Sequence, residues 1–150
     1  MRRYVCQIPK TSYTAAMGVQ TIFEATAAAD VPITIIEAHI TNVDSETSTM
    51  ELMDIVRFAT AGTGGTAITE EPLDPGDAAA SFTAVEEPTV EGGTPTSLTL
   101  ESWNILSGYH YVPLPESRIK CEGSDIIAIR IAEALEATIS LVGYVIVQEG

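Results

Sequence analysis

The chain has few of the side chains that most often carry out chemistry in proteins. Its 150 residues include only two histidines, His39 and His110, and two cysteines, Cys6 and Cys121. Two histidines cannot supply the ligands of a three-histidine metal centre. No Gly-x-Ser-x-Gly elbow and no glycine-rich loop ending in Gly-Lys-Ser/Thr occurs. These absences argue against an enzyme, and we expect no cofactor and no bound metal.

The two cysteines stand near opposite ends of the chain. A closed sheet could bring them together, but two reduced thiols are the simpler interpretation for a protein inside a cell. Long apolar runs are also absent. No stretch approaches the roughly 18 apolar residues of a membrane-spanning helix. Met1-Arg2-Arg3 is not followed by the apolar segment of a signal peptide, so we expect neither a leader nor a membrane partner.

Positive charge is scarce. Seven Lys and Arg stand against 21 Asp and Glu, which gives a net charge of −14. Nucleic acids and anionic membranes are bound through Lys and Arg, so we expect neither as a partner. No Lys or Arg occurs between Phe58 and Ser117, whereas the basic residues lie toward the chain ends. If the ends meet in space, the molecule has an acidic pole and a less acidic pole, which would orient docking.

Short β-prone runs alternate with turns rich in Gly, Pro, Asp and Thr. We predict strands over residues 3–8, 20–26, 33–43, 50–60, 80–85, 97–105, 109–114, 118–121, 126–131 and 139–147. A helix is the competing interpretation for residues 50–60, because Leu52, Ile55, Val56 and Ala59 also fit helical spacing, but the β-branched content favours a strand. The pattern predicts an all-β fold, a single antiparallel β-sandwich domain of jelly-roll-like type over residues 1–150.

Two segments stand apart from the predicted strands. Residues 70–96 contain four prolines and three glycines and predict a long irregular central loop. Such a long excursion is commonly a functional loop or an interface arm. Residues 1–12 include the strand at 3–8, which Pro9 would end, and we interpret them as an N-terminal arm.

Three local patterns are candidate ion sites, and each has a simpler interpretation. Glu37 and His39 share a face of a predicted strand and could hold a metal, or form an ordinary pair in a partly buried or interface position. Asp74 and Asp77 flank a Pro-Gly turn that resembles part of a calcium loop, or is only a solvated turn. The segment 62–66 has the glycines of a phosphate loop but not its lysine, which favours a flexible loop.

An aromatic cluster is the remaining local candidate. Trp103, Tyr109 and Tyr111 lie close together in the sequence. Tyr and Trp are frequent at interfaces and sugar sites, so the three are interface candidates. Packing in the core is the alternative.

The second half of the chain resembles a known family. The resemblance runs from Trp103 through Tyr109-x-Tyr111-x-Pro113-x-Pro115-Glu116-Ser-Arg118, a glycine-containing turn and Ile127-Ala-Ile-Arg130-Ile to Gly143-x-Val145 and Gln148-Glu149. Residues 73–83 and 31–42 fit the same pattern. These features, over roughly residues 20–148, resemble small jelly-roll proteins encoded among the head genes of tailed bacteriophages.

The resemblance implies a structural function. Proteins of this group are often head decoration or cement proteins, usually trimers, that bridge neighbouring major capsid subunits on the outer capsid. By this resemblance we expect a homotrimer in the virion, on the outer surface of the head, and in the host cytoplasm before assembly. We further predict that Arg2, Arg3 and Lys10 contact an acidic surface of the major capsid protein. The group has no catalytic residues to carry over.

Two other functions remain as alternatives. A host-recognition or glycan-binding module of a tail or head fibre would present Trp103, Tyr109 and Tyr111 in an exposed patch. A small cupin-type metal enzyme would need more histidines than the chain has.

Overall fold

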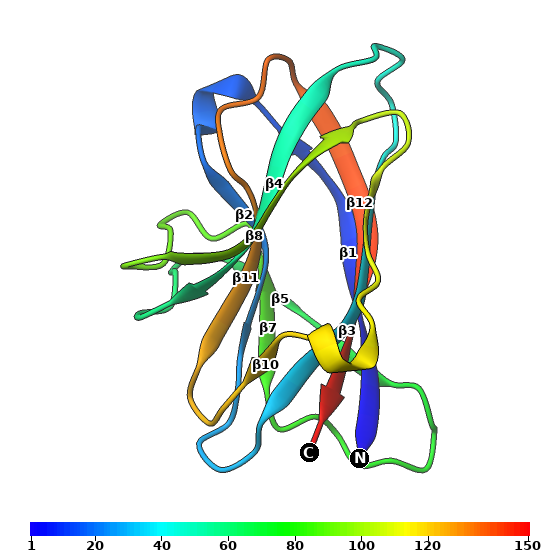
Figure 1. The fold of residues 1–150 in the computed structure, drawn as a ribbon, viewed down its shortest axis with the longest axis vertical. Helices are drawn as coiled ribbons and strands as arrows, with labels where there is room; N and C mark the ends of the chain where they lie inside the picture. Colours follow the sequence, from blue (N-terminus) through cyan, green and yellow to red (C-terminus); the bar gives the residue numbers. More distant parts are fainter.

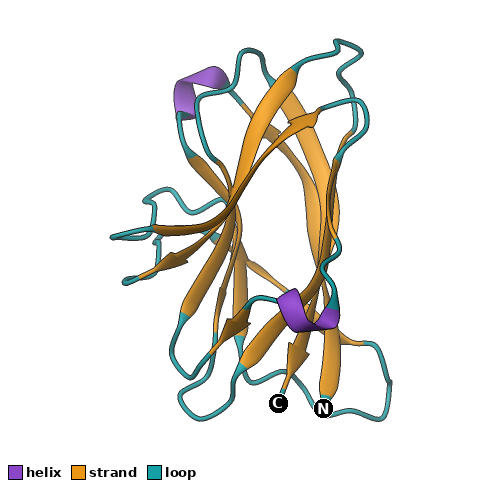
Figure 2. Ribbon diagram, viewed as in Figure 1, coloured by secondary structure: helices purple, strands orange, loops and turns teal.

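Alternating apolar side chains build a sandwich of two antiparallel sheets of six strands each, in a computed structural model that describes all residues 1–150 (Figure 1, Figure 2). The predicted all-β sandwich is confirmed. Sheet A contains β10 (Lys120–Cys121), β3 (Ile33–Asn42), β12 (Ile139–Glu149), β1 (Arg2–Tyr13) and β6 (Glu70–Pro72), in that order, with β9 (Tyr109–Tyr111) also paired to β3. Sheet B runs β5 (Thr66–Ile68), β7 (Thr83–Glu86), β2 (Gln20–Thr26), β11 (Ile126–Ile131), β4 (Met50–Phe58) and β8 (Thr96–Asn104).

Helical structure is limited to two single turns, η1 (Ala15–Met17) and η2 (Pro115–Ser117). Neither turn has the length or the apolar character that a membrane crossing requires. Residues 50–58 form β4, so the helical interpretation of that segment is wrong.

The strands follow one another in pairs, with one member in each sheet. The pairs are β1 with β2, β3 with β4, β6 with β7, and β11 with β12. They stack in the same order through the molecule, as β6-β1-β12-β3 in sheet A and β7-β2-β11-β4 in sheet B. This repeated crossing between sheets gives the sandwich its jelly-roll-like character.

One core of 30 buried residues fills the space between the sheets. As the alternation predicts, Ile127, Ile129 and Ile131 of β11 point into this core. The core takes Val145 and Val147 from β12. Burying such branched side chains from both sheets is the main force that holds the layers together.

Residues 1–12 do not form an arm, which corrects the prediction from the sequence. They belong to β1, which pairs with β12 along one edge and with β6 along the other. Tyr4, Cys6 and Ile8 are buried in the core, and that burial ties the segment to the sheet. The strand continues past Pro9 because an irregularity between Ile8 and Thr11 leaves the proline outside the ladder.

The predicted strands at 97–105 and 109–114 enter different sheets. β8 pairs with β4 in sheet B, whereas β9 pairs with β3 in sheet A. The loop between them therefore crosses from one layer to the other. The predicted irregular segment 70–96 also contains two short strands, β6 and β7, which join opposite sheets.

The outer face of sheet B is partly covered by the chain itself. Residues 59–65 and 87–95 run beside each other, joined by bridges between Thr60 and Gly93 and between Thr63 and Val90. They lie next to a second apolar cluster formed by Val56, Phe58, Ile126 and Ala128. The outer face of sheet A carries exposed side chains, among them Gln7 of β1 and Tyr144 of β12.

Candidate functional site

The longest uncovered edge of the sandwich is β8, the outermost strand of sheet B. β4 is its only partner, so its other edge carries unpaired backbone groups along nine residues. Leu98 is 37%, Leu100 60% and Val112 63% exposed. Leu98 and Val112 line one hollow where β8 faces the chain that follows β9. We call this uncovered strand edge, together with the side chains of Leu98, Leu100, Glu101 and the neighbouring Val112, the β8 edge.

Proteins usually protect such an edge with lysine, proline, a bulge or a covering loop. Residues 96–104 contain no lysine and no proline, and Glu101 is their single charged residue. The one protective feature is the register shift opposite Ile55 and Val56, where Leu98 is the extra residue. The β8 edge is therefore suited to pairing with another protein.

The aromatic candidates do not lie on the surface. Trp103 is 5%, Tyr109 1% and Tyr111 8% exposed, and all three belong to the main core. Burial raises the pKa of the Tyr109 and Tyr111 hydroxyls, which keeps both neutral. The core interpretation is thus the correct one for these rings, and they do not form the exposed patch that a glycan-binding module requires.

The three predicted capsid-contact cations do not form one patch. Arg2 begins β1 and Lys10 lies eight residues further along the strand, about 27 Å away at the rise of an extended strand. Arg2 forms an ion pair with Glu149 (2.8 Å), and Lys10 with Asp44 (3.6 Å). Arg3 is exposed, and its Nε donates to the neutral side chain of Gln148 (3.3 Å).

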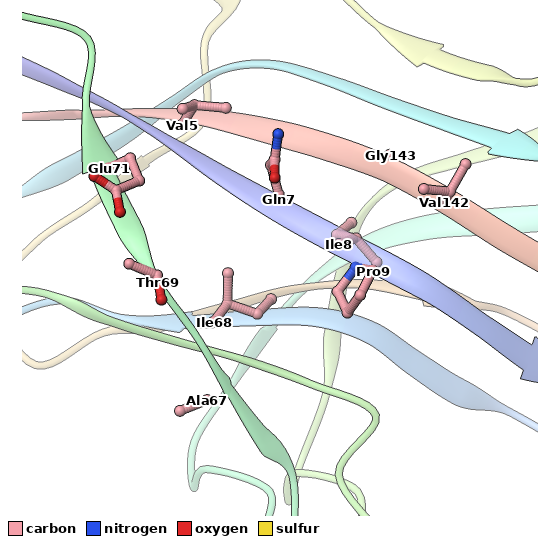
Figure 3. Close-up of a pocket in the computed structure, with 10 residues that line it drawn as sticks. All are labelled: Val5, Gln7, Ile8, Pro9, Ala67, Ile68, Thr69, Glu71, Val142 and Gly143. Atoms are coloured by element: carbon pink, nitrogen blue, oxygen red, sulfur yellow. The ribbon is translucent and has the colours of Figure 1, made fainter.

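The outer face of sheet A carries a hollow beside β1 (Figure 3). The hollow lies between the side chains of Gln7 and Pro9, the segment 67–69, and Val142 of β12. Glu71 is its only charged lining residue. This surface has little charge and offers contact area rather than a cluster of reactive groups.

The other patterns singled out from the sequence have local explanations in the fold. The Asp74 carboxylate accepts from the Gly76 N–H, and the Asp77 N–H donates to the Asp74 carbonyl (both 2.9 Å), so this segment is a hydrogen-bonded turn. The glycine-rich segment 62–66 lies beside sheet B, where the Gly62 N–H donates to the buried Glu24 carboxylate. No group of three or more His, Cys, Asp or Glu side chains converges in a metal-binding arrangement.

Cys6 and Cys121 are free and buried. They stand on β1 and β10, three strand spacings apart in sheet A, or about 14 Å. That separation exceeds the reach of a disulfide, about 7 Å between Cα atoms. Burial raises the pKa of Cys6 to about 12 and that of Cys121 to about 11, so neither thiol is an activated nucleophile.

The two chain ends meet at Glu149, which fulfils the condition on which the predicted acidic pole depends. Figure 1 shows both termini at the same end of the molecule, and Arg2 lies opposite Glu149 in the ladder. The Glu149 carboxylate accepts from the Ser81 N–H (2.7 Å), the Ser81 hydroxyl and the Tyr4 hydroxyl (3.3 Å). Burial by itself raises its pKa, but the Ser81 hydrogen bonds and Arg2 outweigh burial, and the pKa of Glu149 is lowered.

Glu149→Gln is expected to reduce the free energy of unfolding at pH 7 by about 2 kcal/mol, because hydrogen bonds to a charged group are lost. Because the pKa of Glu149 is lowered in the folded state, its carboxylate contributes its full stabilisation of the fold at pH values above the ordinary pKa of a glutamate. That contribution is lost as the pH falls through the lowered value. Urea unfolding between pH 7 and pH 3 should therefore show the two proteins converging on acidification. The exposed Glu133→Gln is the control, and a constant gap across this range would contradict the assignment.

The structure also brings together two residues that the sequence did not pair. His39 of β3 lies directly across from His110 of β9, although 71 residues separate them. Glu37 approaches the other side of the His39 ring at 3.4 Å, which confirms the predicted pairing of Glu37 with His39. The only local signal for His110 is its place between two buried tyrosines, which turns its side chain outward.

Comparison with known proteins returned no match: no protein-family model, no curated protein and no solved structure is similar to this chain.

Proposed function

We propose that this protein is a structural virion protein, a capsid decoration or cement protein. It binds the outer head surface of a tailed bacteriophage and stabilises contacts between major capsid subunits. The observation that carries the proposal is the β8 edge, a long apolar strand edge left uncovered on a rigid sandwich. The resemblance of residues 103–149 to phage head proteins is the reason for proposing a phage head as the assembly to which the protein binds.

The β8 edge is the place where copies of this chain meet in the proposed oligomer. Copies that each carry a net charge of −14 repel one another. They approach with least repulsion where charge is sparse, and Glu101 is the single charge from Thr96 to Asn104. In a closed trimer, a strand of the neighbouring copy other than its own β8 adds at this edge, satisfies the unpaired backbone groups and covers Leu98 and Leu100.

A closed ring of copies then multiplies weak capsid contacts into a stable attachment. Arg2, Arg3 and Lys10 remain the predicted contacts to the capsid. Arg3 is the most available of them, because it is exposed and bonds only a neutral side chain. Deleting residues 2–10 cannot test these contacts, because the deletion removes most of β1 from the sheet.

Light scattering tests the oligomer, and co-sedimentation with heads of the encoding phage tests the capsid contact. We expect a mass three times that of the 15.9 kDa chain, and protein that sediments with the heads. Leu98→Asp with Leu100→Asp is expected to give monomers, because each copy would then bring two buried charges to the interface. The control Leu73→Asp changes an equally exposed leucine on a loop and should leave the trimer intact.

A wild-type monomer that does not sediment with heads would overturn the proposal. A trimer that survives both β8 substitutions would place the copy contact elsewhere on the molecule, most directly on the outer face of sheet A.

A further inference from the structure

The two histidines form a pair on the outer face of sheet A. His39 and His110 are opposite each other in the β3–β9 ladder, and their ring centroids are 4.9 Å apart. The Nδ1 atoms of the two rings face each other at 2.7 Å. This distance leaves no room for a water molecule between the nitrogens and is short enough for a single proton to link them.

The remaining ring nitrogens face oxygen atoms. His39 Nε2 lies 3.4 Å from the Glu37 carboxylate, and His110 Nε2 lies 3.1 Å from the Ser107 carbonyl. A carboxylate and a carbonyl oxygen can only accept hydrogen bonds. These contacts favour the tautomer in which each ring carries its proton on Nε2 and donates it to the neighbouring oxygen.

This assignment decides the state of the Nδ1 atoms. A neutral imidazole carries one proton, so both Nδ1 atoms are bare when both rings are neutral. In that tautomer two bare Nδ1 atoms stand 2.7 Å apart, and their lone pairs repel each other. A positive ion bound by both lone pairs removes the repulsion. The geometry of the two rings is thus arranged for a cation.

We propose that His39 and His110 bind a divalent transition metal ion of the class that prefers imidazole, such as Zn²⁺, Cu²⁺ or Ni²⁺, through their Nδ1 atoms. Imidazole nitrogen favours these ions over Mg²⁺ and Ca²⁺, which prefer oxygen. This site is independent of the capsid role proposed above.

The surroundings match those of histidine ligands in metal sites. A metal-bound histidine usually donates its second ring N–H to a carboxylate or a backbone carbonyl, as His39 does to Glu37 and His110 to Ser107. Tyr144 of β12 stacks on the His39 ring, with centroids 5.0 Å apart, and limits its rotation. His110 is exposed, which leaves the outer side open for water to complete the coordination.

The rings need only a small movement to accept the ion. With bonds of 2.0–2.1 Å, two nitrogens of a tetrahedral zinc site stand about 3.3 Å apart. The Nδ1 atoms must therefore separate from 2.7 Å by a fraction of an ångström. The exposed His110 ring can supply this movement without disturbing the core, because β9 is an edge strand of sheet A.

Calorimetric titration of the full chain with ZnCl₂ and CuCl₂ at pH 7.5 tests the site. We expect one ion per chain, with Cu²⁺ bound more tightly than Zn²⁺ and no comparable binding of Mg²⁺. His110→Asn and His39→Asn should each abolish this binding. Glu37→Gln should weaken it by about 10–100-fold, the usual effect of losing a partner of a ligand. The control Glu71→Gln removes an exposed carboxylate of the same sheet and should bind as the wild type does.

A His110→Asn protein that binds Zn²⁺ as well as the wild type would overturn the proposal. Absence of metal binding by the wild type would also overturn it, and would leave a shared proton as the cation between the rings. If the variants fail to fold, the location of the site can still be tested with the wild-type protein alone. Sub-stoichiometric Cu²⁺ should broaden the NMR signals of the two imidazole rings first, and broadening that begins elsewhere would refute the site.

Discussion

Asp54→Ala is expected to lower the free energy of unfolding by about 3–5 kcal/mol, the usual cost of removing one member of a buried ion pair. Asp54 of β4 lies directly opposite Arg130 of β11. The Arg130 guanidinium donates from Nε to Oδ1 (2.9 Å) and from a terminal nitrogen to Oδ2 (3.1 Å). The Asp54 side chain is 4% and that of Arg130 17% exposed, so the variant leaves a guanidinium with little access to water.

The loss of stability should come from the Arg130 charge that is left unpaired, rather than from the loss of the ion pair itself. Replacing both partners, as Asp54→Leu with Arg130→Met, should therefore recover most of the lost stability. Lys120→Ala breaks a pair with Glu122 whose side chains are both largely exposed, and it should change little. Chemical denaturation of the four proteins measures these differences. An Asp54→Ala protein as stable as the wild type would show that the pair contributes nothing.

Gly143→Ala is expected to cost about 3 kcal/mol, at the upper end of the range for overpacking. Gly143 of β12 lies between β1 and β3 and is paired with a residue on each side, Ile8 and Ile40. A Cβ atom at this position would stand 1.9 Å from the carbonyl oxygen of His39. This oxygen belongs to the backbone of β3. The clash is therefore relieved only if β3 and β12 move apart, which weakens the hydrogen bonds between the two strands.

The matched control is Gly76→Ala. A Cβ at Gly76 would meet only the Asp74 carboxylate, at 3.4 Å, in an exposed turn. We expect no measurable change in the thermal unfolding midpoint for Gly76→Ala. A chain of this size should lose about 6–12 °C for Gly143→Ala. Equal midpoints for the two variants would mean that β3 and β12 tolerate the methyl group at no cost.

Local patterns were sufficient for much of the fold. A period of two predicts strands over residues 20–26 and 126–131, and both strands have the predicted bounds. Alternation also identified the inward face of β11. It fails in β3, where it would place Ile35 and Glu37 on one face. A register shift near Ile36 instead turns Ile35 inward and Glu37 outward, and no local signal marks that extra residue.

The sequence by itself determined the sandwich class, the net charge and the positions of most strands, because these follow from composition and from a period of two residues. Only the tertiary structure decided that residues 2–13 form a strand paired with β12, that Trp103, Tyr109 and Tyr111 are buried, and that β8 is left uncovered. It also placed His110 beside His39. Each of these depends on which strand pairs with which, and pairing is set by packing between segments far apart in the chain.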